Sequence, residues 1–181
     1  MRGALTVIPW LGPGVLASLV ASVILATRIA RMLRTRRWVA MLLVISGGLI
    51  LSATVTPLRD ALEGGVTTVG RGCDLGRLTL AGLDQLLRIN DTSLNVALFV
   101  PLGAAIGLLP ASPYRFNVLV AAVLLPVAIE ATQLVLPILG RGCQSADVVD
   151  NLTGLAAGFV IAAVAARLWS AVGSRSARPR P

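Results

Sequence analysis

Residues 116–139 read FNVLVAAVLLPVAIEATQLVLPIL, and this run decides the fold of the chain. It is long enough to cross a bilayer as a helix, which takes about 20 apolar residues. Its single charged residue is Glu130. A charge at the centre of a membrane helix costs about 2.5–3.5 kcal/mol on insertion scales, so it is usually paired or functional. Gln133 lies three residues further on, on the same helical face, and the two side chains mark a candidate site.

The composition of the 181-residue chain is that of a membrane protein. Hydrophobic residues make up 56% and charged residues 13%, whereas soluble domains carry about 25% charge. The net charge of +8 comes from arginines that lie between and beyond the apolar runs, so membrane topology explains it and we expect no nucleic-acid partner. The chain has no histidine, which excludes the commonest general base and His-ligated metal sites. We expect neither a metal nor a cofactor.

A hydropathy window of about 19 residues predicts five membrane-spanning helices. They cover residues 11–27, 38–56, 94–109, 116–139 and 148–169. The third is short and needs a thin or tilted placement in the bilayer. The first is too long for the core of a signal peptide, and arginines follow it rather than precede it, so we expect a retained helix. The predicted fold class is therefore all-α, a polytopic transmembrane helical bundle of about five spans.

Charge sorts the connecting segments into two sides. Arginines follow the first, third and fifth spans, and no Asp or Glu lies in those three segments. By the positive-inside rule these segments are cytoplasmic, so the N-terminus lies outside and the C-terminus inside. We expect a first helix with its basic loop (1–37), a transmembrane domain (38–169) and a basic, disordered cytoplasmic tail (170–181). Every basic residue of the chain is arginine, which we interpret as the codon bias of a GC-rich bacterial genome. Together with the predicted spans, this source predicts a multi-pass protein of the bacterial plasma membrane.

The longest loop, residues 58–93, falls on the predicted outer side. Within it, leucines recur at helical spacing while charged residues take other faces, which predicts an amphipathic helix. These leucines are Leu75, Leu78, Leu83, Leu86 and Leu87. The helix would either cap the bundle or lie on the outer leaflet.

The two cysteines end matching tetrapeptides, Gly-Arg-Gly-Cys, at residues 70–73 and 140–143. Both tetrapeptides lie on the predicted outer side, where an oxidising environment permits a disulfide. We expect a bridge between Cys73 and Cys143, with two unpaired thiols as the alternative.

Six polar side chains lie in or just above the outer half of the predicted membrane region and could converge on one ligand-binding site. They are Asn95, Glu130, Gln133, Arg141, Asp147 and Asn151. At 1.5 Å per residue, Glu130 lies roughly 20 Å from the inner end of its span. Asp147 and Asn151 are four residues apart and share a helical face. GxxxG motifs at residues 103–107 and 154–158 would let helix backbones approach closely.

Structural roles stay open for the same residues. Glu130 could bind a cationic or hydroxyl-bearing ligand, or form an ion pair with Arg141. It could also stay neutral in a desolvated site, hydrogen-bonded to Gln133 or Asn95. Arg141 could instead bind the phosphate of a lipid headgroup. Asp147 could cap the start of the last helix, whereas Asn95 could fix helix packing.

These residues resemble the VanZ-like family, which is named for a teicoplanin-resistance protein. Three ordered motifs carry the resemblance: NxxxFxPxG at residues 95–103, IExxQ at residues 129–133 and RxxxxxDxxxNxxGxxxG at residues 141–158. Family members often carry Asp where this chain has Gln144, and Asp150 could substitute for it. The resemblance covers residues 40–168 and implies a small multi-helix membrane protein associated with low-level glycopeptide resistance.

Three functions remain open. The first is binding of a lipid, a lipid-linked envelope precursor or a glycopeptide at the outer-leaflet polar site, with the bilayer as the constant partner. The second is a membrane-embedded enzyme that uses Glu130 and Asp147 as acid and base, although no nucleophile–base pair, metal cluster or phosphate loop supports it. The third is a small transporter, for which no inverted repeat is evident. We favour the first.

Overall fold

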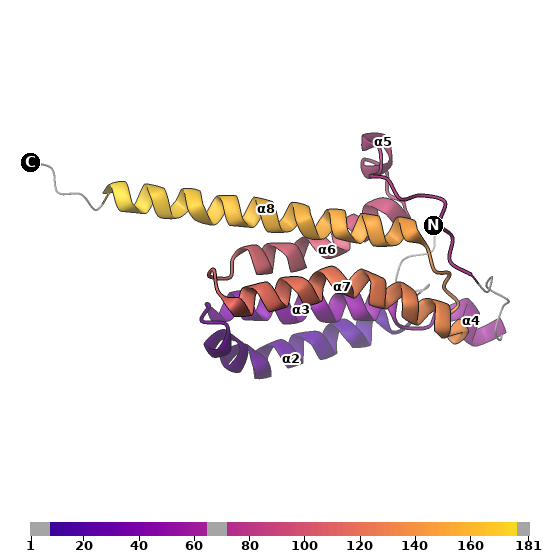
Figure 1. Ribbon diagram of the computed structural model, residues 1–181. Helices are drawn as coiled ribbons and strands as arrows, with labels where there is room; N and C mark the ends of the chain where they lie inside the picture. The colour runs from indigo at the N-terminus through magenta and orange to yellow at the C-terminus, as the bar shows by residue number, and fades with distance from the viewer. Residues whose placement is uncertain (1–7, 65–71, 177–181) are drawn as a thin grey trace, which may run out of the picture.

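The computed structural model describes residues 8–64 and 72–176, which form a bundle of helices (Figure 1). The elements are α2 (Leu11–Met32), α3 (Arg37–Thr54), α4 (Arg59–Gly64), α5 (Leu83–Leu86), α6 (Asp91–Gly107), α7 (Pro113–Val135), the 3-10 turn η1 (Pro137–Leu139) and α8 (Ser145–Ser176). These described residues contain one isolated bridge, between Asp74 and Gln144, and no strand. The predicted all-α class is therefore confirmed.

Four helices of the described chain are long and apolar enough to cross a membrane: α2, α3 with its continuation into α4, α7 and α8. At 17 residues α6 is shorter, about 26 Å long, and so slightly less than the ~30 Å hydrocarbon core. The prediction of about five spans, with a short third one, agrees with this arrangement. The predicted disordered tail is wrong as far as Ser176, because α8 continues to that residue; residues 177–181 lie outside the described residues.

Glycines line the contact between α6 and α8 and bring their backbones together. A Cβ on Gly103 would overlap the carbonyl oxygen of Leu155, and a Cβ on Gly158 would overlap that of Val100. The other glycine of each GxxxG motif faces the partner helix in the same way. Both motifs therefore serve packing, as small residues do in membranes, where lipid tails are as apolar as the helices.

Gly158→Ala is expected to destabilise the bundle by about 1–3 kcal/mol, the usual cost of overpacking a tight contact. Gly47→Ala in α3 is the matched control, because a Cβ there meets nothing within 4 Å. Thermal unfolding in detergent micelles should show a lower midpoint for Gly158→Ala and an unchanged or higher one for Gly47→Ala. Equal midpoints would contradict the close approach of α6 to α8.

A second set of small residues, which the hydropathy pattern did not reveal, joins α2 to α3. They recur at every fourth position of α2: Gly14, Ser18, Ser22, Ala26 and Ala30. Gly14 packs against Ser52, and Gly48 packs against Ser18. Each helix therefore contributes one glycine that contacts a serine of the other helix. Both serine hydroxyls donate to carbonyls one turn earlier in their own helices, at 2.6 and 2.7 Å, which satisfies them within the bundle.

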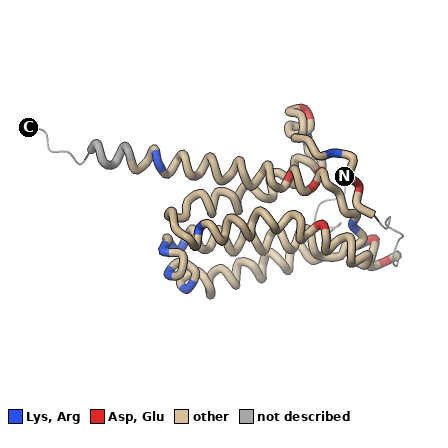
Figure 2. Tube along the Cα trace, in the orientation of Figure 1, with Lys and Arg blue, Asp and Glu red and all other residues tan. Residues whose placement is uncertain are grey.

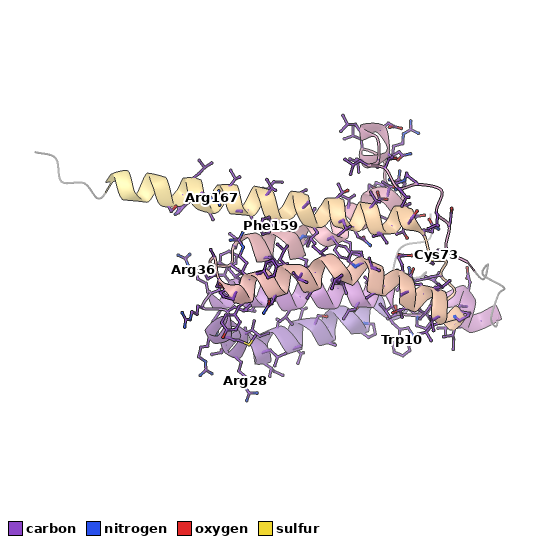
Figure 3. All side chains as sticks on the ribbon, in the orientation of Figure 1. Trp10, Arg28, Arg36, Cys73, Phe159 and Arg167 are labelled. Atoms are coloured by element: carbon purple, nitrogen blue, oxygen red, sulfur yellow. A yellow bond between two sulfur atoms is a disulfide. The ribbon has the colours of Figure 1, made fainter. Side chains whose placement is uncertain are left out.

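Charge divides the bundle end to end (Figure 2). Arginines gather where α2 meets α3, and acidic residues gather at the opposite end. In Figure 3, Arg28, Arg36 and Arg167 lie toward the first end, and Trp10 and Cys73 lie toward the second. We name the acidic end the outer end, because the positive-inside rule predicts that the arginines face the cytoplasm.

The outer segment between α4 and α6 does not form the predicted amphipathic helix. Within its described residues, 72–90, the only helix is the single turn α5. The Asp74 carboxylate accepts a hydrogen bond from the Gly76 N–H at 2.8 Å, and the Asp74 backbone is bridged to the segment before α8. These contacts hold Leu75 and Leu78 in non-helical backbone, so tertiary structure overrides the helical spacing of the leucines.

Candidate functional site

The outer strap, residues 73–78, is fastened to the segment that leads into α8. Cys73 and Cys143 form a disulfide whose Cα atoms lie 4.6 Å apart. Beside it, the Asp74 N–H donates to the Cys143 carbonyl at 2.9 Å, and the Ser145 N–H donates to the Asp74 carbonyl at 2.8 Å. A covalent bond and two backbone hydrogen bonds therefore hold the strap.

An ion pair from the strap reaches into the bundle at Asp150. This residue of α8 is 1% exposed, and its Oδ2 accepts from Nη2 of Arg77 at 2.5 Å. Arg77 also donates through Nη1 to the Thr79 carbonyl at 3.0 Å, and its own carbonyl accepts from the Ser145 hydroxyl at 2.8 Å. Arg77 therefore engages one oxygen of the Asp150 carboxylate, while Oδ1 of Asp150 has no hydrogen-bond partner among the described residues.

Glu130 is buried near the outer end of α7, with 5% of its surface exposed. Its Oε2 accepts a hydrogen bond from the backbone N–H of Gln144 at 2.7 Å. Gln144 follows Cys143 directly, so the disulfide fixes the position of the group that contacts the carboxylate. The backbone of Gln144, and not its side chain, makes this contact.

Two polar side chains contact the outer end of α3. Nε2 of Gln133 donates to the Thr54 carbonyl at 3.0 Å, and Nε of Arg141 donates to the Thr56 carbonyl at 3.5 Å. Carbonyls at the end of a helix have no partner within the helix, so such bonds satisfy them inside the bundle. Gln133 thus has a structural role and directs its donor to α3 rather than to Glu130.

Arg141 is positioned by a left-handed turn at Gly140, where φ is +67°. A Cβ at this position would also overlap the Cβ of Ala61, so the turn requires glycine. Nη2 of Arg141 is buried and has no hydrogen-bond partner among the described residues. Burial lowers the pKa of Arg141, while the nearby carboxylates of Asp147 and Glu130 raise it, and the guanidinium stays charged.

Glu130, Arg141 and Asp147 lie near one another without a direct ion pair. Arg141 interacts electrostatically with both carboxylates, yet within the described chain no ion pair shorter than 4.0 Å joins it to either. Of the alternatives that the sequence left open for Glu130, the ion pair with Arg141 is therefore not formed. Asp147 lies beside the Asn95 side chain of α6. One turn further on, Asn151 is 1% exposed, and its Oδ1 has no partner in the described part of the chain.

An apolar cavity of about 370 Å³ lies next to Glu130. Its wall comes from α7, the outer strap and the start of α8, and Glu130 is the one charged residue of that described wall. Val127 and Leu134 of α7 are 53% and 42% exposed, and Leu75 and Leu78 of the strap are more exposed still. The cavity is therefore open at the surface of the bundle, on an exposed apolar side of α7.

Together these residues form a charged and polar cluster beside an apolar cavity. The described residues hold no group of three His, Cys, Asp or Glu that could bind a metal ion. Charged side chains with free hydrogen-bonding capacity can recognise a polar head group, and the cavity can hold an apolar chain next to it. The arrangement is suited to an amphiphile.

A family model described as VanZ/LLP1 matches residues 38–166, which is most of the chain. The chain belongs to the VanZ/LLP1 family. The VanZ/LLP1 region begins in α3, and it contains every residue of the cluster, the cavity and the outer strap. Searches of curated proteins and of solved structures found no match. Membership of the VanZ/LLP1 family and the four long apolar helices of the described chain both indicate a membrane protein.

Two contacts of the VanZ/LLP1 region were not predicted from the sequence. The N–H of Gln144 that contacts Glu130 belongs to the main chain, which has no sequence signature. Arg77 and Asp150 are 73 residues apart, beyond the reach of local spacing. A signal for this pair was present, however, because Asp150 is an acidic residue inside the last apolar run, where a charge needs a partner.

Proposed function

We propose that this VanZ/LLP1 protein binds a membrane amphiphile, either a lipid or a lipid-linked component of the cell envelope, at the outer end of α7. The apolar chain occupies the cavity, and the polar head lies against Glu130, Arg141 and Asp147. The observation that carries the proposal is the position of Glu130, a carboxylate only 5% exposed that forms part of an apolar wall. The proposal places this end of the bundle outside a bacterial plasma membrane, as the positive-inside rule predicts.

An apolar cavity alone selects little inside a bilayer. Lipid tails are as apolar as the valines and leucines of the wall, so filling the cavity gains little over leaving a tail outside it. Selectivity has to come from the polar groups at its edge, where hydrogen bonds are strong because the local dielectric constant is low. The volume of about 370 Å³ falls in the usual range of ligand pockets, roughly 300–1,000 Å³. The cavity thus positions the chain, and the head-group contacts choose the ligand.

An enzyme and a transporter are the competing functions. An enzyme would use Glu130 and Asp147 as acid and base on a lipid-linked substrate, and a transporter would move its ligand past Glu130. No specific contact favours either. A glycopeptide, the partner that the family resemblance implies, could meet the head-group residues from the outer side, and a contribution to glycopeptide resistance would follow from such binding.

A photoreactive residue in place of Val127, in the cavity wall, is expected to capture the ligand in living cells. The matched control is Leu16, at the outer part of α2, which is 63% exposed against 53% for Val127 and lies outside the cavity wall. Mass spectrometry should find one amphiphile enriched at position 127 over position 16.

Bulk phospholipids captured in the same proportions at both positions would contradict selective binding. Turnover of the captured amphiphile by the purified protein would favour the enzyme. Flux of the amphiphile across proteoliposomes that depends on Glu130 would favour the transporter.

A further inference from the structure

We propose that the turn between α2 and α3 binds the head group of a phospholipid that carries two phosphates, as cardiolipin does. We name this surface the basic turn and define it by five exposed arginines: Arg28, Arg31, Arg34, Arg36 and Arg37. Figure 3 shows Arg36 at the end of the bundle opposite to Cys73, which lines the cavity. The inference is therefore independent of the proposed function.

The basic turn has no acidic partner. All eight Asp and Glu residues of the chain lie at position 60 or later, and both ion pairs of the described residues lie at the other end of the bundle (Figure 2). Within the described chain, one hydrogen bond uses a guanidinium group of the basic turn, from Nε of Arg31 to the Thr27 carbonyl at 3.3 Å. Guanidinium groups with free N–H donors are well suited to phosphate.

An apolar base holds the backbone of the basic turn. Leu33, Val39 and Leu109, each at most 3% exposed, pack together where the turn meets the connection between α6 and α7. Arg115, at the start of α7, donates from Nη1 to the Leu109 carbonyl at 3.2 Å and so brings a sixth arginine to this end. A surface whose backbone is fixed before binding loses less entropy when a ligand binds, which favours affinity.

Arg34 occupies a backbone position that favours glycine. Its φ is +51°, in the left-handed region, and it directly follows Leu33, the C-cap of α2. Helices often end with glycine here, because a residue with a Cβ is strained in this conformation. The Thr35 N–H donates to the Ala30 carbonyl at 2.9 Å and closes the helix end around Arg34. Such strained residues cluster at functional sites, which supports a binding role for the Arg34 charge.

The basic turn lies at the level of lipid head groups. It joins two helices that are each long and apolar enough to cross a membrane, so it lies where they leave the hydrocarbon core. Trp38, which follows Arg37, is 50% exposed, and tryptophan favours this interface. A phospholipid places its phosphates at this level, and basic surfaces between membrane helices bind cardiolipin head groups.

The arginines are divided between two helices, which favours a head group with two phosphates over one with a single phosphate. Arg28 and Arg31 belong to the last turns of α2, whereas Arg36 and Arg37 form the start of α3. Two linked phosphates can contact both helices at once, and each arginine near an anionic head contributes about fivefold to affinity.

Three lipids added to the purified full chain in a neutral detergent test the proposal: cardiolipin, phosphatidylglycerol and phosphatidylcholine. The midpoint of thermal unfolding should rise most with cardiolipin, less with phosphatidylglycerol and not with phosphatidylcholine. Native mass spectrometry gives the affinities. Arg28→Gln combined with Arg36→Gln, one change on each helix, should weaken cardiolipin binding at least about tenfold.

Arg59→Gln combined with Arg88→Gln is the matched control. This double variant loses the same charge at the outer end of the bundle, and it should bind cardiolipin as tightly as the unchanged chain. Arg34→Gly separates the charge from the backbone, because glycine relieves the left-handed strain. Without lipid it should unfold at the same or a higher temperature, and it should bind cardiolipin about fivefold more weakly.

Equal effects of the three lipids would overturn the assignment, and so would equal losses of cardiolipin affinity in the two double variants. A midpoint shift by inorganic diphosphate as large as that by cardiolipin would show a site for soluble anions and would overturn the choice of a lipid. Unchanged cardiolipin binding in Arg34→Gly would exclude a role for the Arg34 charge.

Discussion

Replacement of Arg77 by methionine is expected to destabilise the folded protein by about 3–5 kcal/mol, the cost of breaking a buried ion pair from one side. The carboxylate of Asp150, 1% exposed, would lose the guanidinium that contacts it. Methionine keeps much of the apolar stem of arginine, so the effect reports chiefly on the charge. Chemical unfolding in detergent micelles measures the change in the free energy of unfolding.

Arg59→Met is the matched control. Arg59 lies 3.8 Å from Glu63, and half or more of each side chain is exposed, so this pair contributes at most about 1 kcal/mol. A second change, Asp150→Leu, added to Arg77→Met should recover most of the lost stability, because no charge is then left buried. If Arg77→Met and Arg59→Met lower stability equally, the Arg77–Asp150 pair does not anchor the strap.

Replacement of both Cys73 and Cys143 by serine is expected to cost about 2–5 kcal/mol of stability. The bridge closes a loop between residues 70 apart in the chain, and its loss frees that loop in the unfolded state. The folded protein should also loosen locally, because Gln144, whose N–H contacts Glu130, follows Cys143 directly.

Amide hydrogen exchange of the double serine variant locates this loosening. Exchange should rise most at Asp74, Gln144 and Ser145, whose N–H groups make the contacts beside the bridge, and stay unchanged where α2 packs on α3. A uniform rise along the chain would mean that the disulfide stabilises the fold without organising the site.

The helices could be predicted from the sequence because the bilayer fixes the length of a spanning segment. α2 begins at Leu11, as expected, and α3 covers Arg37–Thr54 where residues 38–56 were expected. α7 ends at Val135, four residues before the predicted end, because Pro137 begins a 3-10 turn and lacks the N–H that would continue the helix.

The three-residue spacing of Glu130 and Gln133 predicted that they share a helical face, and both lie on the buried face of α7. They are 5% and 6% exposed. Their partners could not be predicted. Gln133 donates to Thr54, 79 residues away, and Glu130 accepts from a main-chain N–H 14 residues away, so local spacing carries no information on either contact.

The outer segment was predicted wrongly for a related reason. The helical spacing of its leucines is a local pattern, whereas the bridge between Asp74 and Gln144 joins distant parts of the chain. The bridge keeps Leu75 and Leu78 out of a helix and places them in the wall of the cavity beside α7. The sequence therefore contained the apolar residues of the cavity without indicating their arrangement.

The amount of amphiphile captured at position 127 in a Glu130→Gln variant, relative to the unchanged chain, tests the proposed site most directly. The variant keeps the size of the side chain and replaces its carboxyl group by an amide. We expect capture of the selected amphiphile to fall at least about tenfold, while capture of bulk lipid at position 16 stays the same. Equal capture of that amphiphile with and without the Glu130 carboxylate would contradict the claim that Glu130 selects the ligand.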